Sequence, residues 1–243
     1  MRMKFGAMGL GVLMLSMAAA PAMCQQKEVH VYRNPWSGDT PENPGPLAKK
    51  LSPKLKAKDI AKAMRKVGDW ELTQATPHFM PDWTEAVLYR GYMAAAKSLP
   101  DAEYRKAMLD MANKTDWKMG VRETVADDQA VAYTYLDFYR QEHDAKMLAP
   151  TKATLDKVMP LPDLCVETCP KWGGKDMPMW WWADSLYMAA PVWAEMYAVT
   201  GDKAYLDHMD KLWWTTSKLL YDTDEHLYSR DASFLNKHEA NGK

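Results

Sequence analysis

A motif that recurs after predicted helices constrains the fold of this chain more than any other feature. The pattern Asp-x-x-Tyr-x-x-x-Met begins at Asp101 and again at Asp202, and a degenerate copy begins at Asp144. Repetition of this kind indicates a supersecondary unit that cannot bury its apolar face alone and therefore stacks on its neighbours. The unit predicted here is a hairpin of two helices, in which the motif opens the second helix.

Apolar residues recur at helical spacing through most of the chain after residue 59, and no convincing strand competes with them. An aspartate stands at or near the start of the first helix of each hairpin, at Asp82, Asp128 and Asp184. Seven helices are predicted, over residues 59–74, 82–99, 101–116, 127–142, 145–159, 179–200 and 202–220.

Stacked hairpins predict an all-α toroid, with the first helix of each hairpin inside and the second outside. All inner helices then begin at one end of the ring, so their aspartates gather at one mouth. Helix N-termini concentrate partial positive charge, and this mouth therefore suits an anionic ligand. The long loops 118–122 and 160–182 lead into it and are expected to contribute to function.

The stretch from Met179 to Pro191 places Asp184 among large aromatic side chains. If the helix begins near Pro178, because proline is favoured at the first helical position, Asp184 lies in the second turn with no capping duty. Loss of solvation against aromatic neighbours would raise its pKa and suit it to general-acid work near neutral pH. The alternative is an aspartate that caps the helix or accepts a hydrogen bond from an indole. The side chains expected on its face are Trp180, Trp181, Tyr187 and Met188.

The charge balance narrows the partners that the protein is expected to have. The net charge is −1, whereas nucleic acid and anionic membranes bind basic surfaces. No nucleic acid and no membrane is therefore expected as a partner. The chain contains 11 Trp and 12 Tyr against 4 Phe. Amphipathic rings suit stacking on sugars while bonding their hydroxyls, although many such residues simply belong to a core.

The N-terminal residues are typical of an export signal, with two basic residues, a short apolar run and the small residues Ala20-Pro21-Ala22. Residues 1–24 are interpreted as a signal peptide, which predicts a secreted or periplasmic protein. Residues 25–55 are proline-rich and are predicted to form an extended arm, and residues 56–243 form the helical domain.

Cys165 and Cys169 lie close enough in a proline-rich loop to form a disulfide, which export would permit. A bridged and a reduced pair are equally compatible with the sequence. A zinc site is not expected, because no His or further Cys lies near enough to complete the ligands. Neither a metal nor a cofactor is predicted.

Three stretches resemble the unsaturated glucuronyl and rhamnogalacturonyl hydrolases of glycoside hydrolase families 88 and 105, and family 105 more closely. They are Val125-Ala-Asp-Asp-Gln-Ala-Val-Ala-Tyr-Thr-Tyr135, Trp182-Ala-Asp-Ser-Leu-Tyr-Met-Ala-Ala-Pro191 with its continuation to Tyr205, and Leu227-Tyr-Ser-Arg-Asp231. The resemblance implies an (α/α)6 barrel. It also implies hydration of the 4,5 double bond of a terminal unsaturated uronate in oligosaccharides left by a polysaccharide lyase, as in pectin degradation.

The same resemblance implies roles for particular residues. Asp184 corresponds to the group that protonates C4 and takes a proton from the water that attacks C5. Asp128 corresponds to a second acid that orients sugar or water, with Asp127 as its neighbour, and the register of this doublet is open by one residue. A cap and one solvated acid are the alternative for the doublet. Trp181, Trp182 and Tyr187 are expected on the sugar-binding face, and Arg230 binds sugar hydroxyls or the uronate unless it lies in a surface turn.

The seven predicted helices are fewer than the twelve of a closed toroid, so the sequence predicts an incomplete ring and an N-terminal part of a longer protein. Marginal stability or association would follow from the exposed apolar faces. A non-catalytic sugar-binding protein, inactive through truncation, and another α/α-toroid lyase or glycosidase remain as alternatives. The oligomeric state is not specified by the sequence.

Overall fold

The computed structural model describes residues 50–100, 102–166, 169 and 177–235. The predicted signal peptide, most of the predicted arm and the motif residue Asp101 lie outside these described residues. None of the described helices is long and apolar enough to span a membrane.

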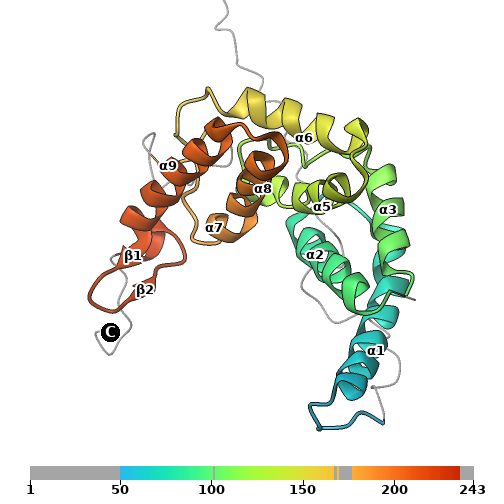
Figure 1. Cartoon of the computed structure of the whole chain (residues 1–243). Coiled ribbons are helices and arrows are strands. Elements are labelled where there is room, and N and C mark those ends of the chain that lie inside the picture. The colour runs from blue at the N-terminus through green and yellow to red at the C-terminus, as the bar shows by residue number, and fades with distance from the viewer. Residues whose placement is uncertain (1–49, 101, 167–168, 170–176, 236–243) are drawn as a thin grey trace, which may run out of the picture.

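The described residues form helical hairpins arranged in an open arc (Figure 1). Helices α2, α5 and α8 lie along its inner side, and α3, α6 and α9 lie along its outer side. Each inner helix packs against the outer helix that follows it, and successive inner helices also touch. The predicted all-α architecture, an incomplete toroid, is confirmed. The helices are α1 (Ala57–Ala75), α2 (Trp83–Ser98), α3 (Tyr104–Lys114), α4 (Ala126–Gln129), α5 (Ala132–Glu142), α6 (Ala145–Val158), α7 (Ser185–Met188), α8 (Ala190–Thr200) and α9 (Lys203–Leu220).

Local capping explains where several of these helices begin and end. Asp82, Asp144 and Asp202 each accept a hydrogen bond from the backbone N–H two residues later, at 3.0, 3.1 and 3.0 Å. Gly201 ends α8 with a φ of +73°, the left-handed conformation that glycine adopts without strain. These caps place a short turn between α8 and α9, as the hairpin prediction requires.

The tyrosine of the repeated motif joins its outer helix to an earlier helix of the chain. Tyr104 and Tyr205 are buried, and their hydroxyls donate to Asp69 on α1 and to Asp156 on α6. A buried hydroxyl needs a hydrogen-bond partner, and the carboxylate supplies it. The tyrosine of the repeat therefore contributes a contact between hairpins.

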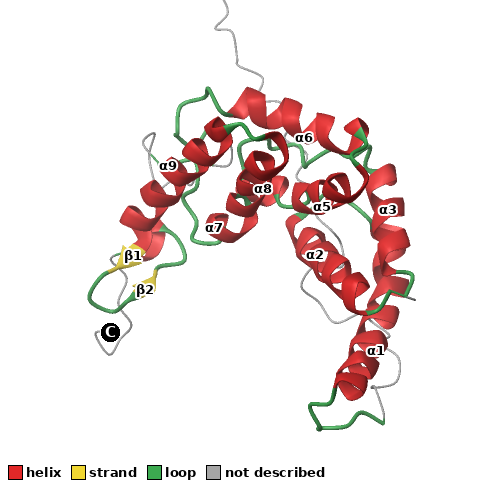
Figure 2. Ribbon diagram, in the orientation of Figure 1, coloured by secondary structure: helices red, strands yellow, loops and turns green. Residues whose placement is uncertain are grey.

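Two predicted helices have different bounds in the structure. The helix predicted over 179–200 begins at Ser185, and residues 179–184 precede it in irregular structure, as the loop there in Figure 2 shows. Pro178 forms an isolated β-bridge with Leu164 and does not open a helix, so Trp180 and Trp181 do not share a helical face with Asp184. The helix predicted over 127–142 is divided into α4 and α5.

The structure also contains a short strand pair that the sequence did not predict. Strand β1 (Tyr221–Asp222) pairs antiparallel with β2 (Leu227–Tyr228). The ribbon is only two residues long on each side, too short to give a period-two pattern.

Candidate functional site

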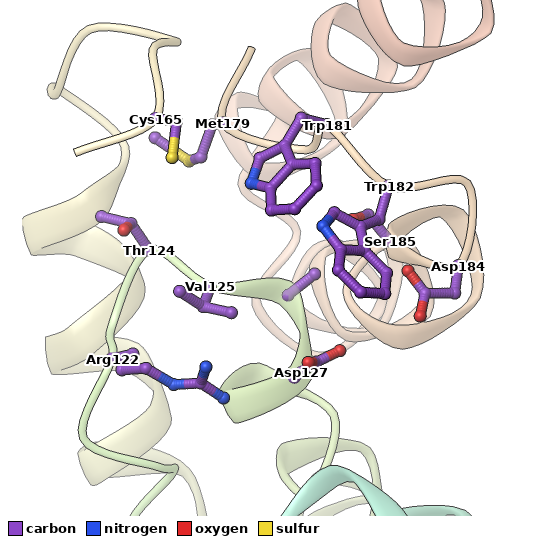
Figure 3. Close-up of a pocket in the computed structure, with 11 residues that line it drawn as sticks. Arg122, Thr124, Val125, Asp127, Cys165, Met179, Trp181, Trp182, Asp184 and Ser185 are labelled. Atoms are coloured by element: carbon purple, nitrogen blue, oxygen red, sulfur yellow. The ribbon is translucent and has the colours of Figure 1, made fainter. Parts of the chain in front are cut away.

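Asp127 and Asp184 face one cavity from the start of two short helices. Asp127 lies in the first turn of α4, and Asp184 is the residue before α7. Neither α4 nor α7 has a side-chain cap, so these carboxylates are not used to begin the helices. Figure 3 shows the two carboxylates directed toward one another.

The cavity between these helices has a volume of about 260 Å³, slightly below the usual range for ligand pockets. Its wall combines the loop before α4 with the irregular segment before α7 (Figure 3). The lining residues are Arg122, Thr124, Val125, Ala126, Asp127, Cys165, Met179, Trp181, Trp182, Asp184 and Ser185.

Two tryptophans form the aromatic side of the cavity. The rings of Trp181 and Trp182 lie 4.8 Å apart at 68°. Trp182 forms a β-bridge with Asp231, and the N–H of Ala183 donates to the carbonyl of Arg230 at 2.9 Å. The Arg230 guanidinium lies 4.9 Å from the Trp182 ring. The chain near residue 230 thus fixes the segment that carries Asp184.

The two acids share one electrostatic environment. Burial and then the negative charge of Asp184 raise the pKa of Asp127 to about 6, and the Arg122 cation opposes this shift. Solvent reaches Asp184, yet partial loss of hydration raises its pKa against the opposing effects of the Ser185 backbone and Arg230. Two like charges so close cannot both ionise freely, so the pair holds a proton more readily than an isolated aspartate does.

Asp128 turns away from the cavity and is held by Arg122. Its carboxylate accepts hydrogen bonds from the backbone N–H of Arg122 at 2.8 Å and from Arg122 Nε at 2.9 Å, and a further bond comes from Nη2. Only 6% of Asp128 is exposed. Burial raises its pKa and the bonds from Arg122 oppose the shift. This donor set fits an ionised carboxylate that fixes the loop 118–122 against α4.

The loop approaches Asp128 so closely that a glycine is required in it. A Cβ on Gly120 would lie 2.5 Å from Cγ and Oδ2 of Asp128, and the N–H of Gly120 donates to the Asp128 carbonyl at 2.9 Å. Just before the loop, Asp116 and Trp117 have φ values of 52° and 59°, a left-handed conformation that is strained for side-chain-bearing residues. The backbone that leads to the acids of α4 is therefore tightly determined.

Gly120→Ala is expected to lower the free energy of unfolding by about 1–3 kcal/mol, because the added methyl overlaps the clamped Asp128 carboxylate. Gly91→Ala is the matched control, since a Cβ there meets nothing within 4 Å and alanine favours the helix. Urea denaturation of both variants measures the difference. Equal midpoints for the two variants would contradict the close approach described here.

The remaining predicted site residues are placed as follows. Tyr187 is half exposed and does not line the cavity; Arg230 does not line it either, but it lies beside Trp182 and its charge acts on Asp184. Cys165 and Cys169 are joined in a disulfide, and Cys165 lies on the cavity wall. Within the described part of the chain, no three His, Cys, Asp or Glu side chains are grouped as metal ligands.

Sequence reasoning did not assign Arg122, Thr124 or Met179 to the site, although the loops that carry Arg122 and Met179 were expected to be functional. Arg122 lies six residues before Asp128, and this spacing alone does not predict that the two side chains meet, because the contact depends on the conformation of the loop between them.

Comparison with known proteins identifies a family for this chain. The sequence profile described as Glycosyl Hydrolase Family 88 matches residues 56–243. A protein of Formosa agariphila named "Unsaturated 3S-rhamnoglycuronyl hydrolase" is 34% identical over 189 residues, which cover 74% of this chain and 49% of the relative. A protein of the same name from Alteromonas sp. (strain LOR) is 26% identical over 242 residues, which cover 85% of this chain and 58% of the relative. The chain thus spans about half the length of these curated relatives.

Two solved structures share the fold. A glycosyl hydrolase family 88 protein from Bacteroides vulgatus has a TM-score of 0.67 at 23% identity, covering 77% of this chain and 56% of that chain. A chain described as a polysaccharide lyase has a TM-score of 0.66 at 24% identity, covering 77% of this chain and 54% of that chain. At these identities the similarity concerns the toroidal fold alone.

Proposed function

This chain belongs to glycosyl hydrolase family 88, and from that premise we propose that it hydrates the 4,5 double bond of a terminal unsaturated uronate. The substrate is an oligosaccharide left by a polysaccharide lyase. The names of the two relatives, which both specify an unsaturated rhamnoglycuronyl unit, support this choice. The more specific assignment to family 105 stays a prediction.

The observation that carries the proposal is the pair of carboxylates across an aromatic cavity. Burial raises the pKa of both acids, and the charge of Asp184 helps to raise the pKa of Asp127 to about 6, so the pair holds a proton more readily than isolated aspartates do. A carboxyl group in this state can give its proton to an alkene carbon and then, as a carboxylate, take one from water. One acid can therefore serve both halves of a hydration.

In the proposed reaction, Asp184 donates its proton to C4 while a water oxygen bonds to C5. The water proton passes to the Asp184 carboxylate, which restores the acid. The C5 hydroxyl makes the ring a hemiketal, which opens and releases the sugar that was linked at C1. In the reactive form the proton held by the pair lies on Asp184, and Asp127 is ionised and orients the water or the sugar.

The geometry favours Asp127 as the second functional acid. Asp127 lines the cavity, whereas Asp128 is turned into the loop and bonded by Arg122. We assign Asp128 the role of holding α4 in place. Trp181 and Trp182 provide the stacking surface for the sugar ring, since their rings line the same cavity.

The sugar that follows the uronate is proposed to be rhamnose. Both relatives carry "rhamnoglycuronyl" in their names, and rhamnogalacturonan from pectin is one source of such a unit. We also propose that residues 1–24 direct secretion to the periplasm or beyond, which the N-terminal sequence of the mature protein tests directly.

The test of the function is the loss of the ultraviolet absorbance of the double bond when purified protein is mixed with lyase-generated disaccharides. Absorbance should fall as free rhamnose appears in equal amount. Cleavage of saturated glycosides alone would favour an ordinary glycosidase, and sugar binding without turnover would favour a binding protein.

A further inference from the structure

Arg90 lies between two tyrosine rings on the inner side of the arc. Its guanidinium carbon is 4.0 Å from the centre of the Tyr133 ring and 4.6 Å from the centre of the Tyr187 ring. The three residues come from α2, α5 and α7, which Figure 1 places along the concave side. The cation is therefore in cation–π contact with both rings.

The edge of this guanidinium has no protein partner among the described residues, in contrast with other arginines of the chain. Arg105 also stacks on a ring, that of Phe138 at 4.9 Å, but it pairs with Glu142. Arg140 pairs with Glu195 at 2.9 Å. A guanidinium carries five N–H donors in one plane. Because the rings contact the guanidinium without accepting from its N–H groups, and no acceptor is present among the described residues, these donors are available to an oxyanion, whose shape they fit.

Arg90 also lies toward the acid pair. The Tyr187 N–H donates to the Asp184 carbonyl at 2.8 Å, so the ring beneath Arg90 is one helical turn from that acid. Side chains on a helix lean toward its N-terminus. This tendency directs a side chain at position 90 toward the N-terminal end of α2, which begins after Asp82.

A uronate brought to Asp127 and Asp184 carries its own negative charge and needs a cation to offset their repulsion. Two of the arginines nearest the cavity are engaged: Arg122 binds Asp128, and Arg230 binds Asp231 through Nε at 2.8 Å. Arg90 has no such engagement in the described part of the chain. We propose that Arg90, held between Tyr133 and Tyr187, binds the carboxylate of the acidic sugar.

This inference rests on the proposed function for the identity of the substrate, and a binding measurement separates the two. Sodium glucuronate and glucose are titrated into the 243-residue chain by tryptophan fluorescence. Arg90→Gln is expected to weaken glucuronate binding by about 10- to 100-fold, the loss typical of a charged hydrogen bond, and to leave glucose binding unchanged. Arg90→Lys keeps the charge and loses the planar set of donors, so its affinity for glucuronate should lie between those of the wild type and Arg90→Gln.

Arg105→Gln is the matched control, because it removes another ring-stacked arginine, on the outer helix α3. It should bind both sugars as the wild type does. The proposal is overturned if wild-type protein shows no preference for glucuronate over glucose, or if Arg90→Gln retains that preference. Retained Arg90-dependent glucuronate binding without hydration of the unsaturated disaccharide would reject the proposed function and leave the anion site standing.

Discussion

Asp184→Asn is expected to reduce kcat on the unsaturated disaccharide by about 10²- to 10⁴-fold, the range found when a general acid–base group is lost. The amide has nearly the shape of the carboxyl group, so the cavity beside Trp182 and Ser185 should stay intact. An amide, however, neither donates a proton to C4 nor accepts one from water. KM should change far less than kcat, because the lost interaction belongs to the transition state. The fall of ultraviolet absorbance with time measures both constants.

Asp202→Asn is the control for this variant. Asp202 also begins a helix, but it caps α9 on the outer layer through the N–H of Ala204. Asparagine is an equally good N-cap, so neither stability nor turnover should change. Wild-type turnover in Asp184→Asn would reject the assignment of Asp184, whatever the control shows.

The hairpin architecture was predictable because the repeat reports on contacts that the fold needs. A buried tyrosine that bonds a carboxylate on an earlier helix occurs in two of the hairpins, as Tyr104 and Tyr205, and Met147 takes the same position in the degenerate copy. Caps such as Asp202 can also be predicted from the sequence, because the capping bond joins residues only two positions apart. The start of α7 could not be predicted from the sequence. β-Bridges from Leu164 to Pro178 and from Asp231 to Trp182 hold the segment before α7 in irregular structure. Such pairing between distant segments overrides local helix preference.

The candidate site was predictable in part, and contacts between distant segments again account for what was not predicted. The sequence predicted that Asp184 and the Asp127–Asp128 doublet lie at one mouth of the toroid. Which member of the doublet faces the cavity depends on the approach of Gly120 and Arg122 to Asp128, which no spacing along the chain indicates. Tyr187 was expected beside the sugar because a helical face was assumed. In the structure its ring does not line the cavity and contacts Arg90.

Asp127→Asn is expected to lower kcat/KM by roughly 10²-fold, at the lower end of the effect of an acid–base partner, and to move the pH profile. The hydration requires a protonated Asp184, so activity falls as pH rises and the pair loses its proton, near the pKa of about 6 given by Asp127. The negative charge of Asp127 disfavours ionisation of Asp184. Once that charge is removed, Asp184 loses its proton at lower pH. The alkaline limb of kcat/KM should therefore move to lower pH.

Asp128→Asn separates the two members of the doublet. It takes from Arg122 the charge that accepts three of its N–H groups, and the loss of such charged bonds costs about 1–3 kcal/mol of unfolding free energy. Its pH profile should keep the wild-type position, because Asp127 and Asp184 remain. Asp127→Asn should show the reverse, with near wild-type stability and a displaced profile. If Asp128→Asn instead displaced the profile while Asp127→Asn only destabilised the protein, the second functional acid would be Asp128, and the clamp around Gly120 would be part of the chemistry.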